Sequence, residues 1–170
     1  VNEYLKSLYV ASAVFRTISP LVEADRSELQ GLAPGDHSFT FAHFPPSMAA
    51  ANASIQVLKE EHLLERSIKM GAIFTGRLKE LQDQYELIGD IRGPGLMIGI
   101  ELVKNRTTKE PAREETSQFV KEGLKRGVIF GESKYLGLGN IVKIKPPLVI
   151  SESQVSKTLE VFEEILKQVS

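Results

Sequence analysis

The chain has 170 residues, a size typical of one domain or of one domain with an arm. Hydrophobic residues make up 42% of the sequence, which is enough to bury a sizeable core and argues against a disordered chain. Its 21 Lys and Arg residues nearly balance its 22 Asp and Glu residues without forming basic blocks, so the charge pattern argues against a nucleic-acid-binding protein.

Targeting and redox signals are also missing from the sequence. No apolar stretch approaches the roughly 18 residues of a membrane span, and the N-terminus lacks the basic and apolar segments of a signal peptide. Cysteine is absent, which excludes disulfides and thiolate metal sites. We therefore expect a cytoplasmic protein without a membrane partner.

The first part of the chain has no obvious core of its own. Residues 1–34 pass from a mostly apolar stretch to a charged, turn-prone one, and residues 33–46 form a loop that contains three prolines. Phe39, Phe41 and Phe44 make this loop too aromatic for a simple linker, so we expect it to pack on another surface.

Two helices are predicted next. Ser47 is suited to cap a first helix that runs to about Lys59. A second helix follows, because small or apolar residues recur at steps of four and three and draw one stripe down one face: Ser67, Gly71, Phe74, Leu78, Leu81 and Tyr85.

After Gly89 the pattern changes to that of a mixed α/β unit. A mostly buried strand is predicted over residues 96–103, a helix over 112–126 with Phe119, Val120 and Leu124 facing inward, and a short strand over 128–130. Gly127 supplies the signal that ends the helix. Two strands joined through a helix predict a crossover unit.

The last third of the chain continues this unit. A glycine-rich hairpin over 131–140 leads into a strand over 141–144, which a pair of prolines stops. Ser151 and Gln154 fit a capping box for a final helix, whose buried face is predicted to hold Val155, Leu159, Phe162, Ile165 or Leu166, and Val169.

Several common kinds of site find no support. His37, His43 and His62 do not have the spacing that places two metal ligands on one helix face, so we expect no metal. The sequence has no Gly-x-Ser-x-Gly elbow for a serine nucleophile. The Gly-x-Gly triplets at 93–95 and 137–139 precede strands rather than helices, which indicates turns rather than a dinucleotide site.

Three segments carry a family resemblance. Residues 37–53 resemble the His-x-x-Thr-Phe segment and the alanine-rich segment of the class III aminotransferases. Residues 88–101 resemble the family's Gly-Asp-Val-Arg-Gly-x-Gly-Leu-Met-x-Gly-Ile-Glu signature, and residues 140–148 resemble its late Asn-x-x-Arg-x-x-Pro-Pro-Leu segment. The family comprises fold type I enzymes that use pyridoxal phosphate, among them 4-aminobutyrate and ornithine aminotransferases.

The resemblance implies a fold and domain boundaries. We expect an α/β fold, the C-terminal small domain of a fold type I transferase, with three or four strands and packed helices. A long helical segment and an N-terminal arm would precede it. Residues 1–45 would be a remnant of the large cofactor-binding domain, residues 46–86 connecting helices, and residues 87–170 the small domain.

The resemblance also implies the roles of three residues. Lys6, 34 residues before Thr40, stands near the family's Schiff-base lysine, the catalytic and cofactor-binding amine. Thr40 corresponds to the threonine that reaches the cofactor phosphate of the neighbouring subunit. Lys143 stands where the family's arginine binds the substrate carboxylate. A solvated surface lysine and a loop-capping threonine are the alternatives for Lys6 and Thr40.

Departures from the family pattern shape the functional hypothesis. The residues after Lys6 lack the family's glycine-rich turn, and lysine at position 143 offers a point charge where arginine offers a fork. Family members are more than twice as long, and the absent part holds the phosphate-binding turn, the aromatic residue stacked on the cofactor ring and the aspartate that pairs with the ring nitrogen.

We therefore expect a truncated or split aminotransferase that moves amino groups between an amino acid or ω-amino acid and a 2-oxo acid. Alone it would be inactive and would bind pyridoxal phosphate poorly. The alternatives are a non-catalytic remnant or dimerisation module and an amino-acid racemase of the same family. The expected partners are a second copy, a complementing N-terminal chain and a small amino-acid substrate.

Overall fold

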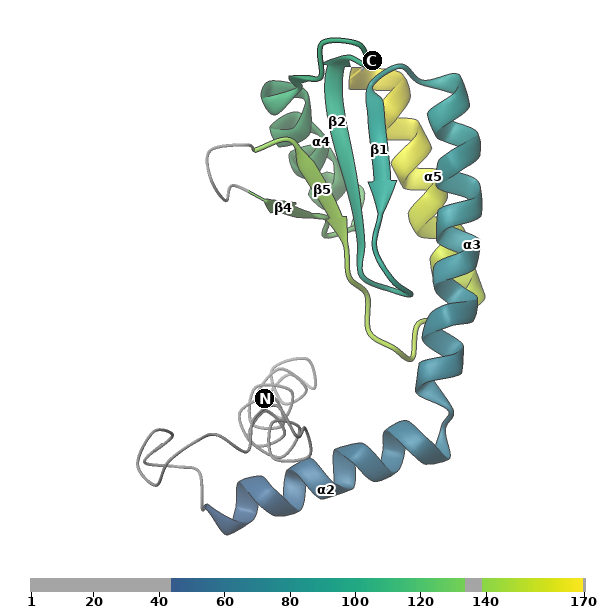
Figure 1. The fold of residues 1–170 in the computed structure, drawn as a ribbon, viewed down its shortest axis with the longest axis vertical. Coiled ribbons are helices and arrows are strands. Elements are labelled where there is room, and N and C mark those ends of the chain that lie inside the picture. The colour runs from purple at the N-terminus through teal and green to yellow at the C-terminus, as the bar shows by residue number, and fades with distance from the viewer. Residues whose placement is uncertain (1–43, 134–138, 170) are drawn as a thin grey trace, which may run out of the picture. The chain divides into compact units, whose positions relative to one another are not determined.

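A computed structural model describes residues 44–133 and 139–169 (Figure 1). The chain divides into two units, residues 1–62 and residues 63–170. The predicted domain boundaries at 45/46 and 86/87 stay a prediction.

The described part of the first unit is helix α2 (Pro45–Glu60). It begins earlier than predicted. Phe44 is the N-cap residue, and its carbonyl accepts hydrogen bonds from the N–H groups of Ser47 and Met48 at 3.0 and 3.3 Å. Ser47 therefore lies inside the helix, and its predicted role as the cap is wrong. Proline at the first helical position explains the shift, because its fixed φ suits a helix start and its missing N–H needs no partner there.

The second unit combines one sheet with three helices. The helices are α3 (Leu63–Gln84), α4 (Arg113–Lys125) and α5 (Glu152–Val169). The strands are β1 (Ile88–Arg92), β2 (Ile98–Asn105), β3 (Glu110–Pro111), β4 (Gly131–Ser133) and β5 (Ile141–Ile144). Their order is β1-β2-β5-β4, with β3 also paired to β2, and every pair is antiparallel.

Helices α4 and α5 lie behind the sheet in Figure 1, and α3 runs beside β1. No helix of the described part of the second unit covers the front face of the sheet, which we call the open face. Strands β2 and β4 run parallel with β5 between them, and α4 connects them. The predicted crossover unit is therefore present in a split form, and the α/β fold with packed helices is confirmed.

Three details differ from the sequence-based expectations. Strand β1 was not predicted, and β2 begins and ends two residues later than expected. The segment 128–130 is not a strand, because the Val128 N–H bonds to the Gly123 carbonyl at 2.9 Å, where the chain leaves α4 through Gly127 at φ 78°. The strand forms three residues later, as β4.

The interior face of α4 also differs from the prediction. Phe119 is buried, but Leu124 is 64% exposed. Five residues turn a helix by about 140° from Phe119, so the inward position of the last turn belongs to Gly123. A Cβ on Gly123 would lie 2.5 Å from the ring of Phe130, so glycine is needed there.

A cluster of aromatic rings joins the helices to β4. Phe130 and Phe162 lie edge-on with ring centroids 5.7 Å apart, and Phe119 contacts both rings. Helix α5 supplies its predicted buried face, and its capping box is confirmed: the Ser151 N–H donates to Gln154 Oε1 at 2.9 Å and the Gln154 N–H to Ser151 Oγ at 3.2 Å.

Helix α3 supports the turn between β1 and β2. Gly95, at φ 51°, lies against the helix so closely that a Cβ on Gly71 would be 2.3 Å from its carbonyl oxygen. The Leu96 N–H donates to Ser67 Oγ at 3.3 Å. The predicted stripe on α3 is therefore confirmed. Its small residues, Ser67 and Gly71, pack against the turn between β1 and β2.

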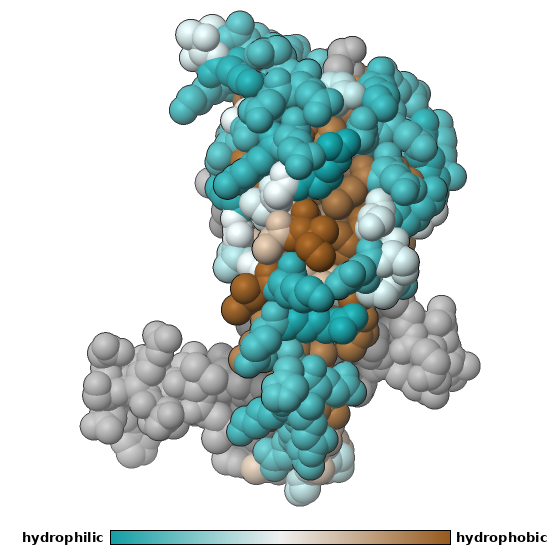
Figure 2. Space-filling view, turned by 90° about the vertical axis from the view of Figure 1, so that its right-hand side faces the viewer, coloured by the Kyte–Doolittle hydropathy of each residue, from teal (hydrophilic) through white to brown (hydrophobic). Residues whose placement is uncertain are grey.

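Seen from the α3 side, the molecule shows hydrophobic side chains between hydrophilic flanks (Figure 2). Three exposed large hydrophobic residues belong to α3: Leu64, Ile68 and Ile73. Among the helices of the described residues, none has the length and hydropathy to cross a bilayer.

The contact between α3 and the turn predicts the effect of two matched substitutions. Gly71→Ala should lower the free energy of unfolding by about 1–3 kcal/mol, because its new methyl group meets backbone that has little room to move. Gly76→Ala, in the same helix but facing open space, should raise it by about 0.5–1 kcal/mol. Urea unfolding followed by circular dichroism measures both. An equal gain for both variants would contradict the close packing of the turn.

Candidate functional site

The sheet register places two rows of residues on the open face. In the first row Lys143 pairs with Gly99 on one side and Gly131 on the other, and Gly99 pairs with Arg92. In the second row Glu101 pairs with Asp90 on one side and with Ile141 on the other, and Ile141 pairs with Ser133. The flanking residues of β5, Val142 and Ile144, are buried, so the alternation of the strand turns Lys143 outward.

Lys143 is a half-buried cation between two glycines. A Cβ on Gly131 would lie 3.3 Å from Lys143 Cβ and 3.6 Å from its Cε, so the aliphatic stem of the lysine extends over β4. On the other side Gly99 places no side chain beside the stem. Within the described part of the chain, the ammonium makes no hydrogen bond or ion pair. A cation in this setting is available to an anionic ligand.

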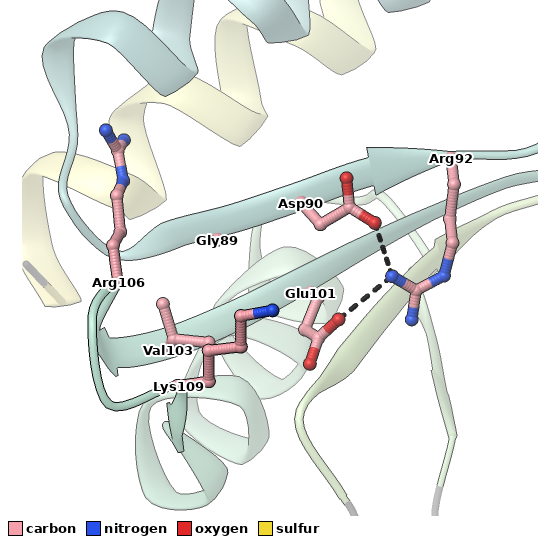
Figure 3. A pocket seen from close by; sticks show the side chains of 7 residues that line it. All are labelled: Gly89, Asp90, Arg92, Glu101, Val103, Arg106 and Lys109. Carbon is pink, nitrogen blue, oxygen red and sulfur yellow. Dashed lines mark hydrogen bonds and ion pairs between the residues drawn. The ribbon is translucent and has the colours of Figure 1, made fainter.

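Arg92, the other cation of the same row, is already neutralised. Its Nη1 donates to Asp90 Oδ2 at 2.5 Å and to Glu101 Oε2 at 2.9 Å (Figure 3). These hydrogen bonds, that to Glu101 first, raise the pKa of Arg92 above its ordinary value. Arg92 therefore ties β1 to β2, and Lys143 is the cation of this row that has no ion-pair partner in the described part of the chain.

A shallow hollow of about 290 Å³ lies on β1 and β2 (Figure 3). It is lined by Gly89, Asp90, Arg92, Glu101, Val103, Arg106 and Lys109. Arg106 is occupied by backbone carbonyls: its Nε donates to Ile88 at 3.1 Å and its Nη2 donates to Tyr85 at 2.8 Å and to Gln82. The hollow is thus built largely from charged groups that already bind one another or the backbone, and it offers no nucleophile with an adjacent base.

The sequence-predicted site residues are only partly described. Lys6 and Thr40 lie outside the described residues, as do His37 and His43. In residues 44–133 and 139–169 there is no group of three His, Asp or Glu side chains placed to hold a metal ion. Lys143 is therefore the predicted site residue whose surroundings can be described.

Sequence reasoning missed two parts of this site. The glycines beside Lys143 belong to strands whose pairing the sequence does not reveal. The Arg92–Glu101 pair lies inside the signature segment, and its signal was the presence of opposite charges at two positions that a β-hairpin brings together.

One side of the glycine turn over 93–95 is closed to a ligand. It is packed against α3 at Gly71, so a phosphate has no access to that side of the turn. Among the described residues, the open face presents the half-buried ammonium of Lys143 between two glycines.

Comparisons with known proteins identify the family that the chain resembles. Residues 19–166 match the family model described as aminotransferase class-III. The chain is 37% identical over 142 residues to an alanine/serine racemase of Pyrococcus horikoshii, a match that covers 84% of this chain and 29% of the racemase.

Solved structures give the same result. An aminotransferase from Bacillus anthracis aligns with a TM-score of 0.74 at 31% identity, over 84% of this chain and 34% of that one. An amine transaminase from an uncultivated Pseudomonas species, in its pyridoxal phosphate-bound form, aligns with a TM-score of 0.71 at 27% identity, over 79% of this chain and 30% of that one.

The chain thus spans about a third of the length of the relatives it matches. The structural likeness confirms the predicted fold class, the C-terminal small domain of a fold type I transferase. A family model that matches residues 19–166 shows that the chain belongs to the class III aminotransferase family.

Proposed function

We propose that this chain supplies the C-terminal part of a pyridoxal phosphate-dependent class III aminotransferase, and that Lys143 binds the carboxylate of its amino-acid or 2-oxo-acid substrate. The observation that carries the proposal is the ammonium of Lys143 on the open face, which lies between Gly99 and Gly131 and has no carboxylate partner among the described residues. A half-buried cation gains more from a carboxylate than a fully solvated one, because water screens the attraction less.

Two residues outside the described part complete the proposal. Lys6 is the cofactor lysine, whose amine would hold the cofactor and move the substrate proton. Thr40 would donate its hydroxyl hydrogen to the cofactor phosphate across a dimer interface. When bound, the cofactor supplies an aldehyde that condenses with amines and a ring that withdraws electrons from the substrate Cα.

The chain corresponds to about a third of its relatives, so activity would require residues of the remaining two thirds. These residues would come from a longer form of the chain or from a complementing chain. Alone, residues 1–170 would bind a substrate carboxylate without transferring an amino group.

The lysine at position 143 sets the quality of the proposed subsite. An ammonium attracts a carboxylate as a point charge, whereas a guanidinium binds both oxygens in one plane. The substrate would be held by its charge but with a looser orientation of its Cα–H bond, and small misplacements lower the rate of a positioned reaction.

Racemisation is the second candidate function. The alanine/serine racemase of Pyrococcus horikoshii is 37% identical to this chain over 142 residues. Racemisation would use the same lysine and carboxylate subsite. Loss of optical activity in an amino acid without any added 2-oxo acid, once the rest of the enzyme is supplied, would distinguish it from amino-group transfer.

The role of Lys6 is tested by labelling the chain with pyridoxal phosphate, followed by borohydride reduction and mass analysis of the peptides. We expect one dominant reduced adduct at Lys6, and we expect Lys6→Ala to lose it. Lys145→Ala, which removes an exposed lysine, is the matched control and should keep it. Equal labelling of many lysines in the unmodified chain would contradict a cofactor site and favour a non-catalytic module.

The role of Lys143 is tested by titrating pyruvate, a small 2-oxo acid, into isotope-labelled chain and following the amide resonances of β5. Lys143→Met should weaken binding about tenfold or more, because it removes a charge-assisted hydrogen bond. Lys143→Arg should bind more tightly than the unmodified chain, since it restores the fork. Lys145→Met should change little. Unaltered binding in Lys143→Met would refute the carboxylate subsite.

A further inference from the structure

Asn140, the residue before β5, is buried to an unusual degree for an amide. The residue is 1% exposed, and among the described residues it and Thr116 are the buried polar ones. Burying an amide costs free energy unless its hydrogen bonds are made, so the bonds of Asn140 indicate what the residue does.

Within the residues that the structure describes, Asn140 makes two hydrogen bonds to Leu102 of β2. Its backbone carbonyl accepts the Leu102 N–H at 2.8 Å, and its side-chain Nδ2 donates to the Leu102 carbonyl at 2.9 Å. In a regular antiparallel pair the second bond would come from a backbone N–H. The side chain of Asn140 therefore adds one further rung to the β2–β5 ladder.

The Leu102 carbonyl joins three segments. It also accepts the N–H of Ala112, the residue that caps α4, at 3.1 Å. Strand β2 exchanges its neighbour at this point, from β5 to β3. Asn140 is thus held where β5 begins. The pairing of β5 with β2 does not continue past this point, so no additional backbone hydrogen bonds there would oppose a shift of register.

Register decides where Lys143 lies. Strand β5 has four residues, so its pairing with β2 rests on few backbone bonds. A slip of one residue would turn Lys143 into the core and Val142 onto the open face, and a slip of two would move Lys143 away from Gly99. The rung at Asn140 opposes both.

We propose that Asn140 is the positioning residue of the carboxylate subsite: its side-chain amide locks β5 in register with β2 and so holds Lys143 between Gly99 and Gly131. The subsite itself rests on the proposed function, but the register lock does not. The Asn140 Oδ1 has no hydrogen-bond partner among the described residues, so the donor Nδ2 is the group that holds the register.

The test uses a direct reporter of register. The Leu102–Asn140 pair is hydrogen-bonded, so by alternation the Gly99–Lys143 pair is not, and its Cα atoms approach to about 4.5 Å. This spacing gives a strong nuclear Overhauser effect between the α-protons of Gly99 and Lys143 in the unmodified chain.

Asn140→Leu keeps a side chain of similar size and loses the donor. We expect the Gly99–Lys143 effect to fall by at least half, a second set of β5 amide signals to appear, and pyruvate affinity to drop about fivefold or more. Thr116→Val is the matched control, because it removes the other buried side-chain hydrogen bond, from Thr116 Oγ1 to the Ala112 carbonyl at 2.7 Å. It should lower stability without changing register or affinity.

Asn140→Asp keeps the shape and loses the N–H donor, and it replaces the leucine variant if that variant fails to fold. An intact Gly99–Lys143 effect, with affinity within twofold of Thr116→Val, would overturn the proposal. Failure of both variants to fold would also overturn it, because a positioning role requires a folded domain without the amide. If the unmodified chain does not bind pyruvate, the carboxylate subsite fails, while the register comparison still decides the role of Asn140.

Discussion

The pairing of β2 with β5 is the interaction on which the rest of this α/β unit depends. Strand β2 holds β1 on one edge and β5 and β3 on the other, and α4 packs against both central strands. The alternation that buries Val142 and Ile144 in the core also turns Lys143 outward. Burial of the core and exposure of the cation are thus one consequence of a single register, because an unpaired lysine in the core would be costly.

Much of this fold could be predicted from sequence because its signals are local. The stripe on α3, the capping box at Ser151 and the end of α4 at Gly127 each depend on residues within one or two helical turns. The strands that were missed or displaced lack such signals. In β1, Asp90 and Arg92 resemble turn residues, and they form a strand because β2 pairs with them. Strand β4 has no β-branched residue, and it forms because it pairs with β5.

The candidate site shows the same division. Lys143 could be identified from the segment that resembles the family, but its isolation could not, since that depends on glycines from two other strands and on the neutralisation of Arg92 by Asp90 and Glu101. Helix caps and apolar stripes depend on residues that are close in sequence, whereas the electrostatic balance of a sheet face depends on which strands become neighbours. Lys6 and Thr40 lie outside the described residues and stay predictions.

If Lys143 binds the substrate carboxylate, as proposed, other groups would have to orient the rest of the substrate. Three rotatable N–H donors on a flexible stem attract an anion from many directions, so the ammonium would fix the position of a bound carboxylate but not the rotation of the substrate about it. Gly99 adds no wall beside the stem, and Arg92 is held by its own carboxylates. On the proposed function, a group that selects one face of the substrate Cα would therefore lie outside the described sheet. On the same proposal, that group would decide between transferring an amino group and inverting a stereocentre, and Lys143 would supply the positive charge that both reactions need.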